Sequence, residues 1–137
     1  MRNAKMVVCL GAFAACVGVP GLSVAEDNCS GHYVDVGSKH ISISNDSSLP
    51  NDGAIGDCDA PLFSTAKSTW IGRCTLQDKD GDLYTYEWTR RAGAEKGLWN
   101  QVSGTGKYVD WKWSGWFEET RIKGPDISVG RWGGNCR

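Results

Sequence analysis

Short runs in which apolar and polar residues alternate fill most of the chain beyond residue 30, and glycine-rich turns separate them. Such alternation is typical of β-strands that present one face to an interior. The runs recur at intervals of roughly 8–12 residues, which is typical of sandwiches and up-and-down barrels. The predicted strands are 32–36, 40–44, 69–76, 83–89, 98–102, 108–113, 116–122 and 127–132. Residues 45–61 are predicted to be a loop, and residues 78–82 the turn of the clearest hairpin.

The composition fits an all-β protein with one domain. A length of 137 residues suffices for one domain, and the 18 glycines argue against a helical bundle. The 15 Lys and Arg residues nearly balance the 16 Asp and Glu residues, which excludes the basic excess of a nucleic-acid-binding surface. We therefore expect a small antiparallel β-barrel of about eight strands over residues 26–137, stapled by disulfides.

The N-terminus has the features of a secretory signal peptide. Two basic residues precede an unbroken apolar run over residues 6–19, which is shorter than the roughly 20 residues of a membrane span. Small residues at the end of this segment predict cleavage between Ala25 and Glu26. The alternative is a lipoprotein signal that ends at Cys16. The mature chain is expected to be periplasmic or secreted and to carry no transmembrane segment.

Four cysteines lie beyond the predicted signal peptide: Cys29, Cys58, Cys74 and Cys136. An even number of cysteines in a small exported domain predicts two disulfides, for which three pairings are possible. We favour Cys58 with Cys74 and Cys29 with Cys136, because a bridge between the ends of the chain limits fraying. A zinc site is the alternative, but no C-x-x-C pair is present and the two histidines are not spaced as ligands.

Aromatic residues follow two of the predicted strands. Tyr84, Tyr86 and Trp88 share one face of strand 83–89, and Val109, Trp111 and Trp113 share one face of strand 108–113. These stripes are consistent with a packed core, with the wall of a ligand cavity or with a sugar-binding surface. The candidate ligand-binding residues are Tyr84, Tyr86, Trp88, Trp111 and Trp113.

The acidic segment 78–82 is a possible calcium loop. When Gly81 takes the sixth position of an EF-hand loop, Asp78 and Asp80 fit the third and fifth positions. The first position then falls on Leu76, which offers no side-chain oxygen, and both flanks have the pattern of strands. We therefore predict an acidic hairpin turn in which Gly81 has a positive φ, and no metal site.

Enzyme motifs are not convincing in this sequence. The serines lack the G-x-S-x-G context of a nucleophile elbow, and Glu118 and Glu119 point to opposite faces of one predicted strand. His32 and His40 are expected at the surface or on an edge strand. No catalytic residue and no cofactor is predicted, and an enzyme is the less favoured class.

Residues 97–108 (GLWNQVSGTGKY), 113–115 (WSG) and 129–134 (VGRWGG) resemble small exported bacterial proteins of the allene oxide cyclase barrel-like class. The resemblance spans about residues 70–134 and implies an eight-stranded antiparallel barrel. Plant allene oxide cyclases have this barrel, but none of their catalytic residues can be placed on this chain. The segment before Trp70 also departs from the class. Residues 103–108 (SGTGKY) are more weakly similar to a loop of periplasmic lysozyme inhibitors.

Two functions follow from these observations. The first is a binding module that holds a small, partly apolar or aromatic ligand inside the barrel. The second is a protein-interaction or inhibitor module that presents the 103–108 loop to a partner such as a cell-wall hydrolase. The residues of that loop expected to make the contact are Ser103, Gly104, Lys107 and Tyr108. The first function needs a cavity, whereas the second needs a filled barrel and an exposed loop.

Overall fold

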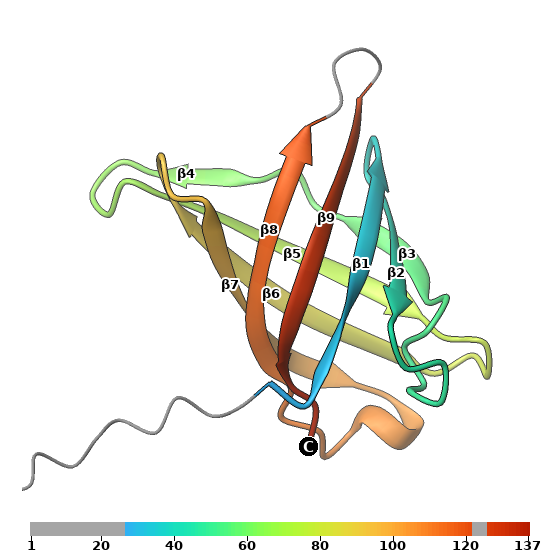
Figure 1. The fold of residues 1–137 in the computed structure, drawn as a ribbon. Coiled ribbons are helices and arrows are strands. Elements are labelled where there is room, and N and C mark those ends of the chain that lie inside the picture. The colour runs from blue at the N-terminus through green and yellow to red at the C-terminus, as the bar shows by residue number, and fades with distance from the viewer. Residues whose placement is uncertain (1–26, 122–125) are drawn as a thin grey trace, which may run out of the picture.

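Nine antiparallel strands form one sheet that closes on itself (Figure 1). The computed structural model describes residues 27–121 and 126–137, so the predicted signal peptide, its cleavage site and Cys16 lie outside the described residues. The strands are β1 (Cys29–Val36), β2 (Lys39–Ser44), β3 (Ile55–Cys58), β4 (Leu62–Ser64), β5 (Thr69–Gln77), β6 (Leu83–Arg91), β7 (Lys96–Gly104), β8 (Ser114–Arg121) and β9 (Ile127–Asn135). A short 3₁₀ helix, η1 (Gly106–Tyr108), follows β7.

Pairing between β3 and β5 closes an eight-stranded barrel, as the sequence predicts. Around the barrel the strands follow the order β3-β2-β1-β9-β8-β7-β6-β5. Four residue pairs join β3 to β5, from Ile55 opposite Gln77 to Cys58 opposite Cys74. The ninth strand, β4, pairs with the other half of β5, at Thr69–Ile71, so it extends the seam and adds no position around the barrel.

Two of the predicted segments are wrong. The segment 45–61 is not all loop, because Ile55–Cys58 forms the strand that closes the barrel. Residues 108–113 do not form a strand, because the chain turns into η1 after Thr105 and then runs below the lower end of the barrel, where Figure 1 draws it in orange. The other predicted strands are present with ends shifted by a few residues, and residue 122 lies outside the described part.

Interior aromatic side chains lie over glycines on the neighbouring strands. Each of four such side chains faces a glycine directly across a strand pair, and a Cβ atom on that glycine would collide with the ring. The pairs are Trp132 with Gly31, Trp88 with Gly72, Phe117 with Gly97, and Tyr33 with Gly130. Glycine therefore provides the room that large rings need inside a barrel of only eight strands.

The lower end of the barrel is closed by the segment that follows β7. Tyr108 has no accessible surface, and its hydroxyl donates a hydrogen bond to Asp78 Oδ2 at 3.0 Å. Trp111 stacks on Trp113 with 4.4 Å between ring centroids, and the Tyr108 ring packs edge-on against both indoles. Val109, predicted to share a face with the two tryptophans, is 60% exposed, so the predicted stripe does not form.

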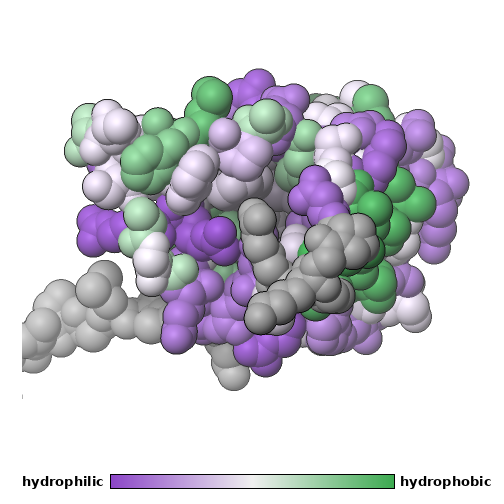
Figure 2. Space-filling view, turned by 90° about the horizontal axis from the view of Figure 1, so that it is seen from above, coloured by the Kyte–Doolittle hydropathy of each residue, from purple (hydrophilic) through white to green (hydrophobic). Residues whose placement is uncertain are grey.

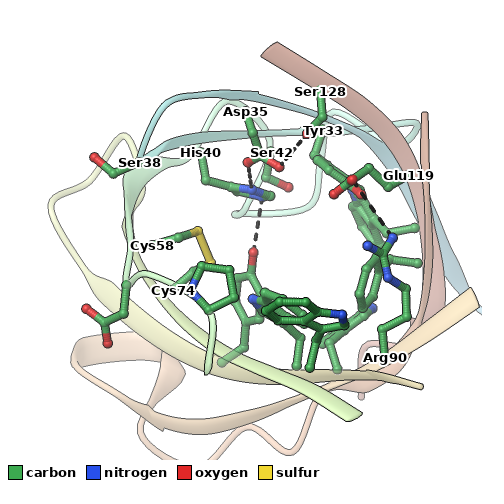
Figure 3. A pocket seen from close by; sticks show the side chains of 18 of the residues that line it. Tyr33, Asp35, Ser38, His40, Ser42, Cys58, Cys74, Arg90, Glu119 and Ser128 are labelled. Carbon is green, nitrogen blue, oxygen red and sulfur yellow. Dashed lines mark hydrogen bonds and ion pairs between the residues drawn. A yellow bond between two sulfur atoms is a disulfide. The ribbon is translucent and has the colours of Figure 1, made fainter. Parts of the chain in front are cut away.

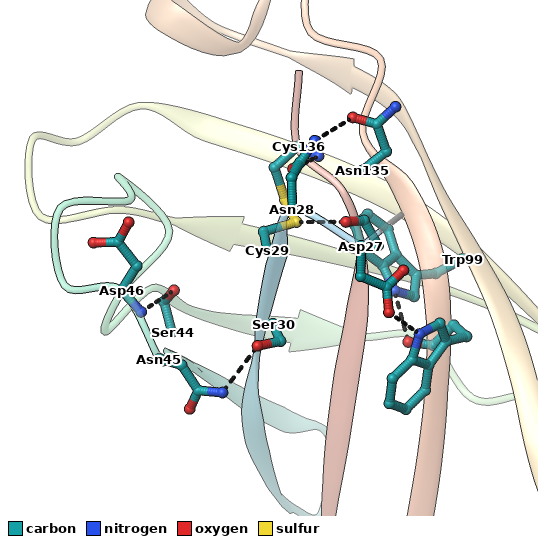
Figure 4. The surroundings of a disulfide bond; sticks show 12 residues. Asp27, Asn28, Cys29, Ser30, Ser44, Asn45, Asp46, Trp99, Asn135 and Cys136 are labelled. Atoms are coloured by element: carbon teal, nitrogen blue, oxygen red, sulfur yellow. Dashed lines mark hydrogen bonds between the residues drawn. A yellow bond between two sulfur atoms is a disulfide. The ribbon is translucent and has the colours of Figure 1, made fainter. Parts of the chain in front are cut away.

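The two disulfides pair Cys58 with Cys74 and Cys29 with Cys136, the pairing that the sequence favours. Cys58–Cys74 links β3 to β5 across the seam. Cys29–Cys136 joins the two ends of the described chain (Figure 4), at the end of the barrel that is lower in Figure 1. Beside it, the Asn28 side chain donates to Asn135 Oδ1 and accepts from the Cys136 backbone N–H, both at 2.9 Å. Such bridges are typical of oxidising, extracellular environments.

Outside the barrel, β-branched apolar residues lie on β1–β3. Val36, Ile43 and Ile55 are between 44% and 53% exposed. Figure 2 looks onto the upper end of the barrel, where hydrophobic residues (green) gather on the side of β1–β3 and hydrophilic residues (purple) cover much of the remaining face. Among the described residues, the structure has no helix with the length and apolar character needed to cross a membrane.

Candidate functional site

Strand β2 points its polar face into the barrel and its apolar face outward. His40, Ser42 and Ser44 are buried, with 8%, 4% and 9% of their surface exposed, whereas Ile43 between them is exposed. A strand that packs on an apolar core has the reverse arrangement. Buried polar side chains are normally stabilised by hydrogen bonds or water, so this wall of the barrel is built for polar contacts.

The barrel interior contains a cavity of about 910 Å³ (Figure 3). This is within the usual size range of small-molecule sites, roughly 300–1,000 Å³. Its upper end is bordered by the β1–β2 turn at residues 37–38, the β3–β4 connection at 59–61 and the start of β9. Tyr84, Gln101 and Trp113 lie at the lower end, near the segment that closes the barrel. The cavity therefore opens at one end and is closed at the other.

Alternation along the strands arranges the lining in two layers. On each of three strands an aromatic residue lies two positions from a polar residue that is nearer the upper end: Tyr33 and Asp35 on β1, Trp88 and Arg90 on β6, and Phe117 and Glu119 on β8. The aromatic layer consists of Tyr33, Trp88, Trp99, Phe117 and Trp132, and the polar ring above it of Asp35, His40, Arg90, Glu119 and Ser128. The cavity is consequently amphiphilic along its axis.

Hydrogen bonds to the backbone fix the aromatic layer. The indole N–H of Trp99 donates to the carbonyl of Trp116 at 3.1 Å, and that of Trp132 donates to the carbonyl of His32 at 3.2 Å. The two indoles meet edge to face, with 6.2 Å between centroids, as do Trp88 and Phe117 at 5.7 Å. Because their indole N–H groups are bonded to the sheet, the rings of Trp99 and Trp132 present apolar surface to the cavity.

A hydrogen-bonded chain crosses the polar ring. His40 Nδ1 lies 2.7 Å from Asp35 Oδ1, and His40 Nε2 lies 3.2 Å from the Tyr86 hydroxyl on the other side of the interior. The Ser128 hydroxyl donates to Asp35 Oδ2 at 3.2 Å, so both carboxylate oxygens are held. The His40 ring also stacks on Tyr33, with 5.2 Å between centroids. The chain fixes the position of Asp35 and the orientation of the imidazole before any ligand arrives.

A second polar pair lies on the opposite side of the ring. Arg90 Nη1 and Glu119 Oε1 are 3.9 Å apart, and their side chains are 26% and 19% exposed. Burial raises the pKa of the Tyr33 phenol above its ordinary value, and the carboxylates of Glu119 and Asp35 raise it further, whereas Arg90 acts in the opposite direction. Tyr33, in the aromatic layer, therefore lies within the electrostatic influence of both carboxylates of the polar ring.

Burial also raises the pKa of Tyr86 well above its ordinary value, with smaller contributions from Tyr84, Asp35 and Tyr33. The Tyr86 hydroxyl is thus neutral at physiological pH and can donate or accept a hydrogen bond.

A ring nitrogen of His40 and the sulfurs of Cys58 and Cys74 lie within 4.8 Å of one another, but the sulfurs are bonded to each other and are not thiolate ligands. The described polar groups of the interior interact through hydrogen bonds and charge.

Two amides at the lower end of the cavity have unsatisfied acceptors. Gln101 is 9% exposed and Asn51 5% exposed, and neither side-chain oxygen has a hydrogen-bond partner among the described residues. The Gln101 amide N–H donates to the carbonyl of Tyr108 at 2.8 Å, which fixes its oxygen as the unpaired atom. Unpaired buried acceptors are costly, and they mark a place where a donor from outside the chain would be favourable.

Four of the five predicted ligand-binding residues line this cavity: Tyr84, Tyr86, Trp88 and Trp113. Trp111 does not, because it packs against Tyr108 and Trp113 in the segment that closes the barrel. In the predicted interaction loop, Ser103 is exposed, but Tyr108 is fully buried and Gly104 packs against it. Lys107 Nζ lies 2.6–3.2 Å from carboxylate oxygens of Asp78, Asp80 and Asp82.

Sequence reasoning missed the polar ring. His40 was expected at the surface or on an edge, but it is buried inside the barrel, whereas His32 is exposed as expected. The pairing of strands brings the ring together: Asp35 lies opposite His40 in β1–β2 and opposite Ser128 in β1–β9. The sequence also carries the alternation of His40, Ser42 and Ser44, but no pattern in it states which face is inside.

Comparison with protein-family models finds no match to this chain, and comparisons with the curated proteins and with the solved structures find no match either. The resemblance to allene oxide cyclase-like barrels and to lysozyme inhibitors consequently stays a prediction from the sequence. The geometry of the cavity is the basis for the functional proposals.

Proposed function

We propose that this protein is a non-catalytic binding module that holds a small amphiphilic molecule inside its barrel, with the apolar part of the ligand in the aromatic layer. The observation that carries the proposal is the cavity of about 910 Å³ in which a polar ring lies above an aromatic layer. An eight-stranded barrel is either filled by its own side chains or holds one small ligand, and the hollow interior with a polar wall fits the second case. The fixed hydrogen bonds of Asp35 and His40 provide a preorganised polar contact.

Presentation of the 103–108 loop to a protein partner is less well supported. That function needs a filled barrel and an exposed loop, whereas the interior is hollow and the Tyr108 ring has no accessible surface. Lys107, the one cation of the loop, is already engaged by three carboxylates. A partner would have to break these ion pairs before it could use the lysine.

The neutral aromatic probe N-phenyl-1-naphthylamine tests ligand binding, because its fluorescence rises when it leaves water. We expect saturable binding of one molecule per chain, and about tenfold weaker binding by the Trp88→Ala variant. The indole of Trp88 forms part of the cavity wall, and a lost aromatic contact of about 1–1.5 kcal/mol corresponds to roughly that factor.

Trp111→Ala is the matched control. It removes the same side chain from position 111, which lies in the segment that closes the barrel and does not line the cavity. This variant is expected to lose stability while it binds the probe as the wild type does. The proposal is wrong if the probe does not saturate, or if Trp111→Ala weakens binding as much as Trp88→Ala.

Export is proposed together with this function. We expect the mature chain to begin at Glu26 and to contain no free thiol, since both described disulfides use the four cysteines beyond residue 25. Intact-mass measurement with thiol labelling of protein from its own host checks both statements. A diacylglyceryl group on Cys16 would show that the lipoprotein alternative is correct. Native mass spectrometry of the same sample would reveal a retained ligand.

A further inference from the structure

We infer that the ligand of this cavity carries a positive charge: an organic ammonium group on an aromatic or apolar body. The inference rests on the proposed function and adds the chemical class of the ligand's polar end. It follows from which charges the interior presents, how they are paired and what surrounds them.

Negative charge prevails at the open end of the cavity. Counted over the described lining residues, four carboxylates face a single guanidinium. Asp35 and Glu119 belong to the polar ring, Asp59 and Asp126 lie at the border of the opening, and the guanidinium is that of Arg90. Groups of one sign at the mouth of a low-dielectric cavity concentrate the field there, so a cation is attracted and an anion repelled.

The groups that could receive an anion are already matched. Arg90 lies opposite Glu119, and His40 Nδ1 contacts Asp35 Oδ1 at 2.7 Å. An incoming carboxylate would need Arg90 or His40 as a partner, and it would therefore lie next to the carboxylate of Glu119 or Asp35. An ammonium group meets the opposite situation, because each oxygen of Asp35 accepts one bond within the protein and retains capacity for another.

The aromatic layer favours the same ligand class. Tyr33 and Trp88 lie directly below the polar ring, two positions from Asp35 and Arg90 on their strands, so a cation held by the carboxylates would lie next to this layer. A cation over an aromatic face is attracted by the ring quadrupole, most strongly where water is excluded. Farther down, the unpaired side-chain oxygens of Gln101 and Asn51 are further acceptors in the described lining.

Three ligands with one naphthalene body and different heads test the inference: 2-(1-naphthyl)ethylamine, 2-(1-naphthyl)ethanol and 3-(1-naphthyl)propanoate. Titration calorimetry near neutral pH and low salt would give their affinities for the wild-type protein. We expect the amine to bind at least about tenfold more tightly than the alcohol, and the propanoate to bind more weakly than the alcohol.

Two charge variants with opposite expected signs accompany the titration. Glu119→Gln should weaken binding of the amine several-fold and leave the alcohol unchanged. Arg90→Gln removes the one guanidinium among the described lining residues, so it should strengthen binding of the amine and weaken binding of the propanoate. Glu119→Gln keeps the size of the side chain, whereas Arg90→Gln also shortens it, so if one variant does not fold, the other variant and the wild-type series decide.

The outcomes separate this inference from the proposed function. Equal affinities for the three ligands, or tightest binding of the propanoate, would contradict the inference that the ligand is a cation. The proposal that the cavity binds small molecules would still stand. If none of the three binds and N-phenyl-1-naphthylamine does not bind either, both proposals are wrong. Affinity for the amine that falls as salt is added, with the alcohol unaffected, would be a further sign of charge selection.

Discussion

Replacing Asp78 with alanine is expected to lower the free energy of unfolding by about 3–4 kcal/mol. The Asp78 side chain has no accessible surface, and it accepts hydrogen bonds from Lys107 Nζ at 2.6 Å and from the Tyr108 hydroxyl at 3.0 Å. The backbone N–H groups of Asp80 and Asp82 also donate to it, at 2.9 and 3.0 Å. Without the carboxylate, the phenol of a fully buried tyrosine loses its partner. Urea unfolding followed by fluorescence measures the change.

Asp80→Ala is the control for this prediction. Asp80 lies in the same turn and also contacts Lys107, at 2.9 Å, but its side chain is 60% exposed. An exposed ion pair contributes at most about 1 kcal/mol, so this variant should differ little from the wild type. Equal losses in the two variants would show that the turn acts through its total charge and not through the buried hydrogen bonds of Asp78.

The Asp78 contribution should depend on pH in one direction. Burial alone would raise the pKa of this carboxyl, but the hydrogen bonds from Lys107, Tyr108 and the backbone outweigh burial and hold the pKa below its ordinary value of 3.8. A carboxyl with a lowered pKa in the folded state stabilises the protein above its ordinary pKa, and the contribution is lost as the pH falls through the folded value. The stability difference between wild type and Asp78→Ala should thus be constant near neutral pH and shrink below about pH 4.

The same contacts are the reason why we predict no calcium site in the acidic turn. The ammonium group of Lys107 lies among the carboxylates of Asp78, Asp80 and Asp82, at the place where a cation would be held. Gly81 has a φ of 91°, as the hairpin interpretation predicts. We expect neither a chelator nor millimolar calcium to shift the melting temperature.

The barrel was predictable because most strands alternate strongly and the turns between them are rich in glycine. The strand pairs β5–β6 and β8–β9 are the clearest examples. The strand Ile55–Cys58 was not predictable in this way, because Gly56-Asp57 is typical of a turn. Its conformation comes from pairing with β5, which is distant in sequence, and from the bridge between Cys58 and Cys74.

Alternation misled the prediction for residues 108–113. Val109, Trp111 and Trp113 have the spacing of a strand face, yet the positive φ of Gly106, 50°, and the turn after Thr105 lead the chain into η1. Burial of the Tyr108 ring against Asp78 then outweighs the local preference for a strand. The polar ring was not predicted because alternation shows only that a strand has two different faces. Closure of the barrel decides which of the two faces is inside.

The two disulfides are expected to differ in their effect on ligand binding. Cys58→Ala with Cys74→Ala removes a bridge across the β3–β5 seam, where only four residue pairs join the two strands. Both cysteines of this bridge also line the cavity. Cys29→Ala with Cys136→Ala removes a bridge at the closed end, between the two ends of the described chain. Each double variant should lose about 2–4 kcal/mol of stability, because a crosslink restricts the unfolded chain.

Loop length predicts the larger loss of stability for the Cys29–Cys136 bridge, which spans 107 residues, than for the Cys58–Cys74 bridge, which spans 16. Binding should follow the opposite order. Loosening the seam lets β3 move away from β5, so the cavity loses a defined wall, and we expect N-phenyl-1-naphthylamine to bind at least several-fold more weakly. The Cys29/Cys136 variant, measured well below its own melting temperature, should bind as the wild type does. Weakened binding in that variant alone would show that the closed end, and not the seam, determines the shape of the cavity.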